Sequence, residues 1–126
     1  MSETEQGEDY STPVLPGAGA SDYERYLRTD ELLALQKGPD EWAHRDENLF
    51  QTVHQTSEIW IKHACIEIEE ATRLVEARDV AGALRLLFRA NRALRYVQSF
   101  LDHLELMSPW EYQEVRRVLG HGSGFD

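Results

Sequence analysis

The chain has 126 residues, of which 41% are hydrophobic and 29% are charged. This composition supports one folded domain with a single core and excludes a chain that is disordered throughout. The formal net charge is −10 at pH 7, which argues against nucleic acid as a partner because phosphate binding needs a basic face.

Residues 1–21 predict a disordered leader that precedes one helical domain over residues 22–126. The leader is acidic at first and then rich in Ser, Pro, Gly and Ala (STPVLPGAGAS). It therefore has little apolar side-chain surface that a core could bury. Its first residues are acidic and polar, unlike the basic and then apolar start of a secretory signal peptide. No apolar run approaches the roughly 20 residues that span a bilayer. We therefore expect a cytoplasmic protein.

Residues 22–36 (DYERYLRTDELLALQ) predict an irregular turn followed by a short helix, because the cap-type residues Thr-Asp interrupt the pattern. Tyr23 and Tyr26 share a helix face with Leu27. Such a tyrosine pair usually packs in a core or an interface. The next ten residues, KGPDEWAHRD, predict a loop, since the Gly-Pro pair stops the helix.

Residues 47–77 predict a long helix, with Asp46 at the end of the preceding loop as its N-cap. Apolar and small residues recur in it at steps of three and four, which is the spacing of one buried stripe. Cys65 lies on this stripe, so we expect a buried, reduced thiol. The stripe consists of Phe50, Val53, Ser57, Ile61, Ala64, Cys65 and Ile68.

His54 lies within this stripe, one turn after Phe50, where a leucine would pack better. One interpretation is a core histidine whose ring nitrogens are satisfied by neighbouring groups. The other is a neutral imidazole that lines a pocket and accepts a hydrogen bond from a ligand, with Phe50 as an apolar wall. Gln55, Ser57 and Glu58 are candidates for fixing its tautomer. The residues alone leave both interpretations open.

The residues after Asp79 predict a second long helix, joined to the first by the short turn ARD as an antiparallel αα-hairpin. Its apolar residues are spaced like the seam of a helical bundle. No segment shows the sustained two-residue alternation of a strand. The sequence therefore predicts an all-α fold, a helical bundle with two long antiparallel helices. The apolar face of the second helix would comprise Leu84, Leu87, Leu94, Val97, Leu101 and Leu104.

The stretch SPWE predicts the start of a last helix through a capping box, with Ser108 as N-cap, Pro109 at the first helical position and Glu111 three residues after the cap. Tyr112 and Arg116 then emerge together, because residues four apart share a helix face. They form either a tyrosine packed against an arginine stem or an anion clamp, in which the guanidinium matches a carboxylate and the tyrosine adds a hydroxyl donor. The closing GHGSGFD predicts a flexible turn.

Sequence motifs for a metal or a nucleophile are weak. The five histidines form no HExxH motif, and the single cysteine has no CxxC partner. No Gly-rich loop follows a strand, so the sequence gives no support for nucleotide binding.

Three segments together resemble the tryptophan 2,3-dioxygenase family of haem enzymes. They are, in this order, YERYLRTDELLALQ, DENLFQTVHQTSEIWIK and SPWEYQEVRRVLGHGSGF, and the similarity spans about residues 22–125. The resemblance implies an all-α homotetramer with a haem in each subunit. It also implies an enzyme that uses dioxygen to cleave the 2,3 bond of the tryptophan indole, which yields N-formylkynurenine in the kynurenine pathway of tryptophan catabolism.

The resemblance also implies roles for particular residues. His54 is similar to the distal-side histidine that meets the indole N–H, and Phe50 to the aromatic wall of the indole pocket. Tyr112 and Arg116 are similar to the groups that hold the substrate carboxylate. Ser123 and Gly124 resemble a turn close to the haem and substrate, so the residues expected near the cofactor are Phe50, His54, Ser123 and Gly124. The residues expected to reach into a neighbouring subunit's pocket are Tyr23, Tyr26 and Leu27.

The chain departs from the family pattern in length. Members of the family are more than twice as long, and their haem-ligating proximal histidine lies in a second half that has no counterpart here. The resemblance therefore implies that binding of haem b needs residues beyond this chain, which a separate C-terminal-half chain could supply. Otherwise the chain is a naturally shortened or cleaved form of the family. The ending FD also departs slightly from the usual continuation in the family. The substrate could therefore be a substituted indole or another aromatic amino acid instead of tryptophan. The alternative function is a non-catalytic helical module for oligomerisation or interaction.

Overall fold

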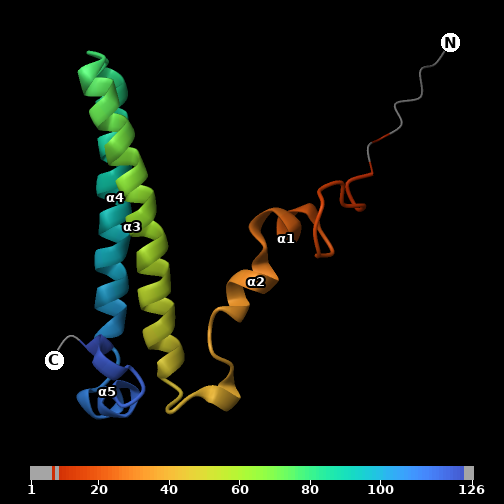
Figure 1. Ribbon diagram of the computed structural model, residues 1–126, viewed down its shortest axis with the longest axis vertical. Helices are drawn as coiled ribbons and strands as arrows, with labels where there is room; N and C mark the ends of the chain where they lie inside the picture. Colours follow the sequence, from red (N-terminus) through yellow and green to blue (C-terminus); the bar gives the residue numbers. More distant parts are fainter. Residues whose placement is uncertain (1–6, 8, 124–126) are drawn as a thin grey trace. The chain divides into compact units, whose positions relative to one another are not determined.

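The computed structural model describes residue 7 and residues 9–123, and these residues form helices, turns and loops without a strand (Figure 1). The all-α fold is therefore confirmed. Two compact units divide the chain, Met1–Gly38 and Pro39–Asp126. Among the residues that the structure describes, no helix combines the length and the apolar content that crossing a membrane requires.

The first unit contains two short helices, α1 (Asp22–Leu27) and α2 (Thr29–Ala34). Ser21 caps α1, since its side chain accepts a hydrogen bond from the Glu24 N–H. Arg28 stands between the helices with a φ of 54°, and this left-handed conformation ends α1 and starts α2. The predicted irregular turn followed by a short helix is therefore, in the structure, two short helices separated by Arg28.

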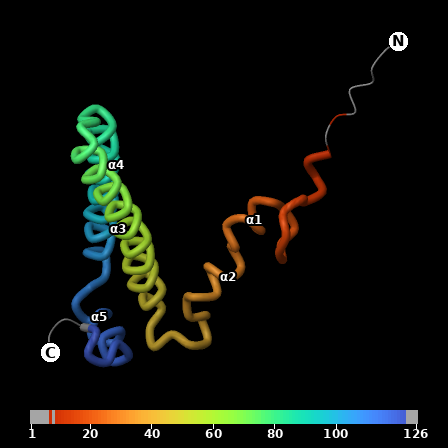
Figure 2. Tube along the Cα trace, turned by 45° about the horizontal axis from the view of Figure 1, so that its top comes forward, coloured from red at the N-terminus to blue at the C-terminus, as the bar shows by residue number. Residues whose placement is uncertain are grey.

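The second unit is built on an antiparallel hairpin of two long helices, α3 (Glu47–Glu76) and α4 (Val80–Leu104). Figure 2 shows that they lie side by side along their length. The hairpin turn uses Arg78 at a φ of 62°, and the Asp79 side chain then accepts a hydrogen bond from the Gly82 N–H at 2.9 Å. The start of α4 follows from ordinary cap and turn chemistry, whereas Asp46 precedes α3 without a side-chain cap hydrogen bond. The predicted bounds of α3 and the predicted start of α4 are right to within a residue.

Alanines make the seam between α3 and α4. One cluster joins Ala64 to Ala90 and Ala93, with Trp60 packed against it. Because the distance between packed helices depends on the side chains at the contact, alanines on both sides let the backbones approach closely. The second cluster consists of Ala71, Ala83 and Leu86, with Leu74 against it.

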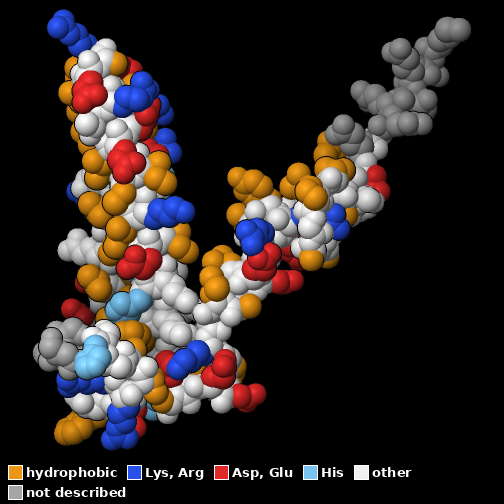
Figure 3. Space-filling model, viewed as in Figure 1, with side chains coloured by type: hydrophobic (Ala, Val, Ile, Leu, Met, Phe, Trp, Pro, Cys, Tyr) orange, Lys and Arg blue, Asp and Glu red, His pale blue; other side chains and the backbone are white. Residues whose placement is uncertain are grey.

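The predicted apolar face of α4 is wrong. Four of the five leucines assigned to the seam are exposed, and Leu104 and Val97 are half-buried, while alanines beside these leucines in sequence are buried. Figure 3 shows hydrophobic side chains exposed along the hairpin. Spacing identifies a face but does not say whether large or small residues occupy the helix contact, and here the small residues do. The exposed leucines are Leu84, Leu87, Leu94 and Leu101.

The buried stripe of α3 also differs from the prediction. His54 and Cys65 are both exposed, so the prediction of a buried thiol is wrong. The stripe instead includes the carboxylate of Glu67, which lies 3.3 Å from the Arg89 guanidinium of α4. This pair links the two helices across the seam. The buried residues of α3 are Glu47, Val53, Ser57, Ala64, Glu67 and Ala71.

A short helix, α5 (Pro109–Arg116), follows α4, and a 3-10 turn, η2 (Gly120–Ser123), comes after it. Val115 of α5 is fully buried, at 0% exposure, and so anchors this helix. A second 3-10 turn, η1 (Pro39–Glu41), precedes α3. This arrangement sets α5 beside the first turn of α3, where the candidate site lies.

Candidate functional site

Three aromatic rings from α3 and α5 come together. The rings of Phe50 and His54 stack with centroids 4.0 Å apart and an angle of 27° between their planes. Tyr112 of α5 lies on Phe50 with centroids 6.3 Å apart and an angle of 29°. Offset stacking at these separations is favourable for aromatic pairs. The structure therefore unites three residues that the sequence assigned to one pocket.

The backbone fixes the tautomer of His54. Its Nδ1 atom lies 2.7 Å from the carbonyl oxygen of Phe50, one turn earlier in α3. A carbonyl oxygen only accepts hydrogen bonds, so Nδ1 carries the proton and the neutral ring keeps its lone pair on Nε2. Ser57 does not take part, because its hydroxyl donates to the Val53 carbonyl at 2.6 Å. The exposed imidazole thus offers one acceptor atom to a ligand.

The capping box at the start of α5 has the predicted form. The Ser108 N–H donates to the Glu111 carboxylate at 2.9 Å, and the Glu111 N–H donates to the Ser108 hydroxyl at 3.3 Å. The backbone bond from Ser108 is the largest cause of a lowered Glu111 pKa, followed by the Ser108 side chain, with smaller contributions from Asp46 and His44. The last two residues precede α3. Glu111 therefore caps the helix that carries Tyr112, with its carboxylate near the start of α3.

We expect the contribution of Glu111 to stability to be lost in acid. Its folded pKa lies below the ordinary value of 4.5, so the stabilisation is present above that value and disappears as the pH falls through the folded pKa. Glu111→Gln should lower the free energy of unfolding at pH 7, and the difference from the unmodified chain should shrink toward zero at lower pH. Urea unfolding followed by circular dichroism measures both.

Ser108→Ala serves as the companion variant, because it keeps the carboxylate and removes the cap hydroxyl. It should cost about 1 kcal/mol at neutral pH. A Glu111→Gln effect of the same size at pH 3 and pH 7 would contradict the assigned ionic role.

An apolar cavity of about 340 Å³ adjoins Tyr112. Its other lining residues are Leu104, Met107 and Pro109, which bracket the beginning of α5. Sequence reasoning missed all three as site residues, although a run of apolar residues around a capping box indicates a helix start that packs against something. The cavity is of a size that small-molecule sites commonly have.

The remaining predicted residues fall at three places. Arg116 is half-buried at the end of α5, one turn after Tyr112 on the same helix. Ser123 ends η2, and Gly124 lies outside the described residues. The three residues predicted to contact a neighbouring subunit lie on α1 in the other unit and are exposed, namely Tyr23, Tyr26 and Leu27.

The site has few groups that could bind a metal. Within residues 7 and 9–123, no three His, Cys, Asp or Glu side chains gather as a metal-binding cluster. The residues present fit one side of a flat, apolar cofactor: stacked rings of Phe50 and His54, with an apolar cavity beside Tyr112. Such a site suits an aromatic ligand with one hydrogen-bond donor.

Comparisons with known proteins give a consistent result. The sequence model of the family described as Tryptophan 2,3-dioxygenase matches residues 8–126. A tryptophan 2,3-dioxygenase from Xanthomonas campestris pv. campestris is 39% identical over 107 residues, which are 85% of this chain and 36% of that protein. One from Kineococcus radiotolerans is 38% identical over 103 residues, or 82% of this chain and 36% of that protein. The chain therefore spans about a third of these relatives' length. No solved structure matches it significantly.

Proposed function

Because this chain belongs to the tryptophan 2,3-dioxygenase family, we propose that it supplies the distal pocket and the carboxylate clamp of a haem-dependent oxygenase. The substrate is tryptophan or a substituted indole amino acid. Dioxygen is inserted at the indole 2,3 bond, and ring cleavage gives N-formylkynurenine. The observation that carries the proposal is the exposed His54 ring, held in one tautomer with Nε2 as acceptor and stacked on Phe50.

The acceptor at His54 sets the orientation of the indole. An indole N–H that is buried without a partner costs roughly 1–3 kcal/mol, so the ring favours the pose in which it donates to Nε2. Phe50 stacks on His54 and so limits the movement of the imidazole. In this role His54 is the catalytic residue of the chain, because it contacts the indole ring that reacts.

Tyr112 and Arg116 hold the other end of the substrate. A guanidinium pairs with a carboxylate through two parallel hydrogen bonds, and the tyrosine hydroxyl adds a third donor. Fixing both ends of one amino acid aims the C2–C3 edge of its indole in a single direction. This is catalysis by positioning, since it converts random encounters into a nearly reactive geometry.

Haem, when bound, supplies the iron that activates dioxygen. Phe50 and His54 would face it from one side, and the family resemblance implies that Ser123 and Gly124 also lie close to it. The iron would be held by a histidine from outside these 126 residues, in the same longer protein or in a separate one. In the homotetramer that we propose, Tyr23, Tyr26 and Leu27 of one copy close the pocket of another, and their exposure on α1 supports this role.

Substrate analogues test the role of His54. The chain should bind L-tryptophan about tenfold more tightly than 1-methyl-tryptophan, which lacks the indole N–H, because one hydrogen bond contributes about 1 kcal/mol and an orphaned acceptor costs more. In His54→Ala this preference should disappear. His63→Ala is the matched control on the same helix, since His63 contacts Trp60 and lies outside the three-ring site. NMR titration of the unmodified chain and the two variants with each ligand measures all six dissociation constants.

Two results would contradict the proposal. One is an unmodified chain without any preference between the analogues. The other is a preference that survives in His54→Ala or is lost in His63→Ala. Haem uptake is tested separately with the native assembly, in which L-tryptophan should shift the Soret band.

The exposed leucines of α4 favour the second candidate function, a non-catalytic helical module for oligomerisation. Large apolar faces of this kind mark surfaces that a partner covers. This alternative expects stable oligomers of the chain alone, without affinity for haem or tryptophan. Sedimentation combined with a haem titration separates it from the oxygenase role.

A further inference from the structure

Helix α4 carries a concentrated positive charge in an acidic protein. From Val80 to Leu101 it has no Asp or Glu, while four arginines follow one another at steps of four, three and three. These steps place them along one side of the helix. The whole chain has a net charge of −10, so this stripe is opposite in sign to its surroundings. The arginines are Arg85, Arg89, Arg92 and Arg95.

Three of these guanidinium groups have no acidic partner. Arg89 pairs with Glu67 of α3 at 3.3 Å. Arg85, Arg92 and Arg95 make no ion pair with any residue in the described part of the chain. Like charges three and four residues apart destabilise a helix, so the stripe favours an external anion.

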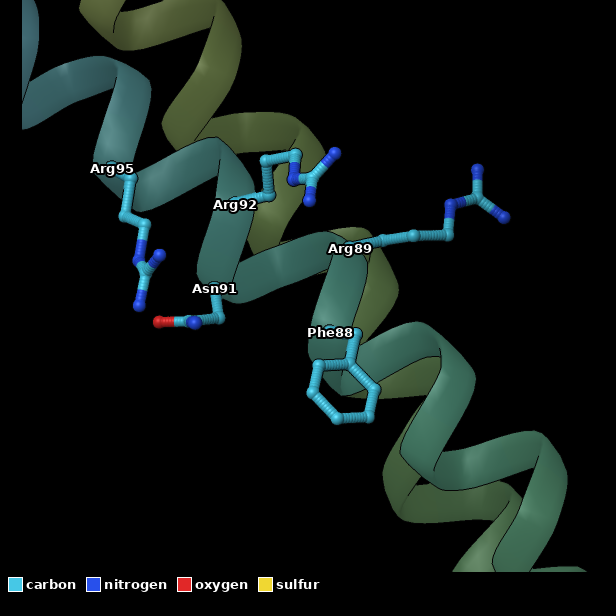
Figure 4. Close-up of a pocket in the computed structure, with 5 residues that line it drawn as sticks. All are labelled: Phe88, Arg89, Asn91, Arg92 and Arg95. Carbon is cyan, nitrogen blue, oxygen red and sulfur yellow. The ribbon is translucent and has the colours of Figure 1, made fainter.

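The stripe borders an open, shallow surface with an apolar floor, and all residues that line it belong to α4. A cavity of about 410 Å³ is lined by Phe88, Arg89, Asn91, Arg92 and Arg95, which Figure 4 shows as sticks on α4. A second cavity of about 210 Å³ is lined by Leu84, Leu87, Phe88 and Asn91. The two share Phe88 and Asn91 and so form one surface. Phe88 is 71% exposed in it, although it is among the most hydrophobic residues of α4.

We propose that this α4 arginine surface docks an acidic amphipathic helix of a partner polypeptide. A partner with leucines on one stripe and carboxylates beside it fills the apolar floor and pairs with the free guanidinium groups. Exposed ion pairs add little affinity, so burial of Phe88 and the leucines provides most of the binding and the charges provide specificity. This function uses none of the residues assigned to the oxygenase site.

A second copy of this chain and a polyanion fit this surface less well than an acidic helix. A second copy that packed its own α4 here would bring arginine onto arginine. A polyphosphate or nucleic acid would leave the apolar floor without a contact. The acidic helix covers the apolar floor with its leucines and pairs its carboxylates with the bordering arginines.

A synthetic peptide tests the proposal on the full 126-residue chain. The probe is an 18-residue helical peptide with a leucine stripe and glutamates at positions i, i+7 and i+10, which repeat the spacing of Arg85, Arg92 and Arg95. Its control has the same composition with the glutamates moved to the opposite face. Fluorescence anisotropy should show the matched peptide binding at least tenfold more tightly than the control.

Charge reversal supplies the second arm. Arg92→Glu should weaken the matched peptide about tenfold, and a peptide with lysines in place of the glutamates should regain binding to this variant. Arg117→Glu, an exposed change at the residue directly after α5, should have no effect, and circular dichroism verifies that each variant is folded. Any of three results overturns the proposal: equal binding of matched and control peptides, a change in oligomeric state on Arg92→Glu, or tighter binding of a short polyphosphate than of the peptide.

Discussion

Replacing Arg116 with alanine is expected to weaken the binding of L-tryptophan more than tenfold and to leave the binding of indole almost unchanged. Hydrogen bonds between charged groups contribute roughly 1.5–3 kcal/mol, and about 1.4 kcal/mol corresponds to a factor of ten. Indole lacks the carboxylate, so its binding affinity does not depend on the Arg116 guanidinium. NMR titration of the 126-residue chain with each ligand gives the two dissociation constants.

Arg117→Ala is the matched control for this variant. Arg117 directly follows Arg116 but is exposed and pairs with Glu114 at 2.9 Å, so its loss should change neither affinity. Similar losses for indole and for L-tryptophan in Arg116→Ala would contradict a carboxylate clamp and would indicate that the end of α5 had been disturbed.

The second large effect is expected at the helix seam. Ala93→Leu should lower the free energy of unfolding by roughly 1–3 kcal/mol, because the added methyl groups overpack a close helix contact. Ala93 is only 1% exposed and lies against Ala64 and Ala90. A substitution that raises hydrophobicity therefore destabilises the protein at this position. Urea unfolding followed by circular dichroism measures the loss.

Gln98→Leu adds a leucine to an exposed position of the same helix and should be close to neutral. Equal stability of Ala93→Leu and Gln98→Leu would contradict an alanine seam. A marked gain in stability for Ala93→Leu would instead support the leucine face that the sequence predicted.

The helices of this protein could be predicted from its sequence, but the packing face of its hairpin could not. Cap and turn residues such as Ser108 and Asp79 act locally, so the structure has the bounds that they indicate. The seam depends on which side chains let two helices approach, and leucine spacing carries no information about that. The same error placed Cys65 in the interior.

The candidate site was predictable in its members but not in its geometry. The resemblance named Phe50, His54 and Tyr112, whose rings the structure brings together, while their roles stay predictions. The tautomer of His54 depends on one backbone carbonyl at 2.7 Å, which no pattern of residue types reveals. Met107 beside Tyr112 was missed because apolar residues around a capping box indicate packing but do not say which of them lines a cavity.

Intermolecular nuclear Overhauser effects between this chain and bound L-tryptophan test the central claim most directly. The claim is that one ligand spans the imidazole of α3 and the guanidinium of α5. We predict contacts from the indole N–H to the His54 ring and, from the same ligand molecule, contacts from its α-proton to the Arg116 side chain. Tryptophan that contacts only one of these residues, or neither, would contradict the account.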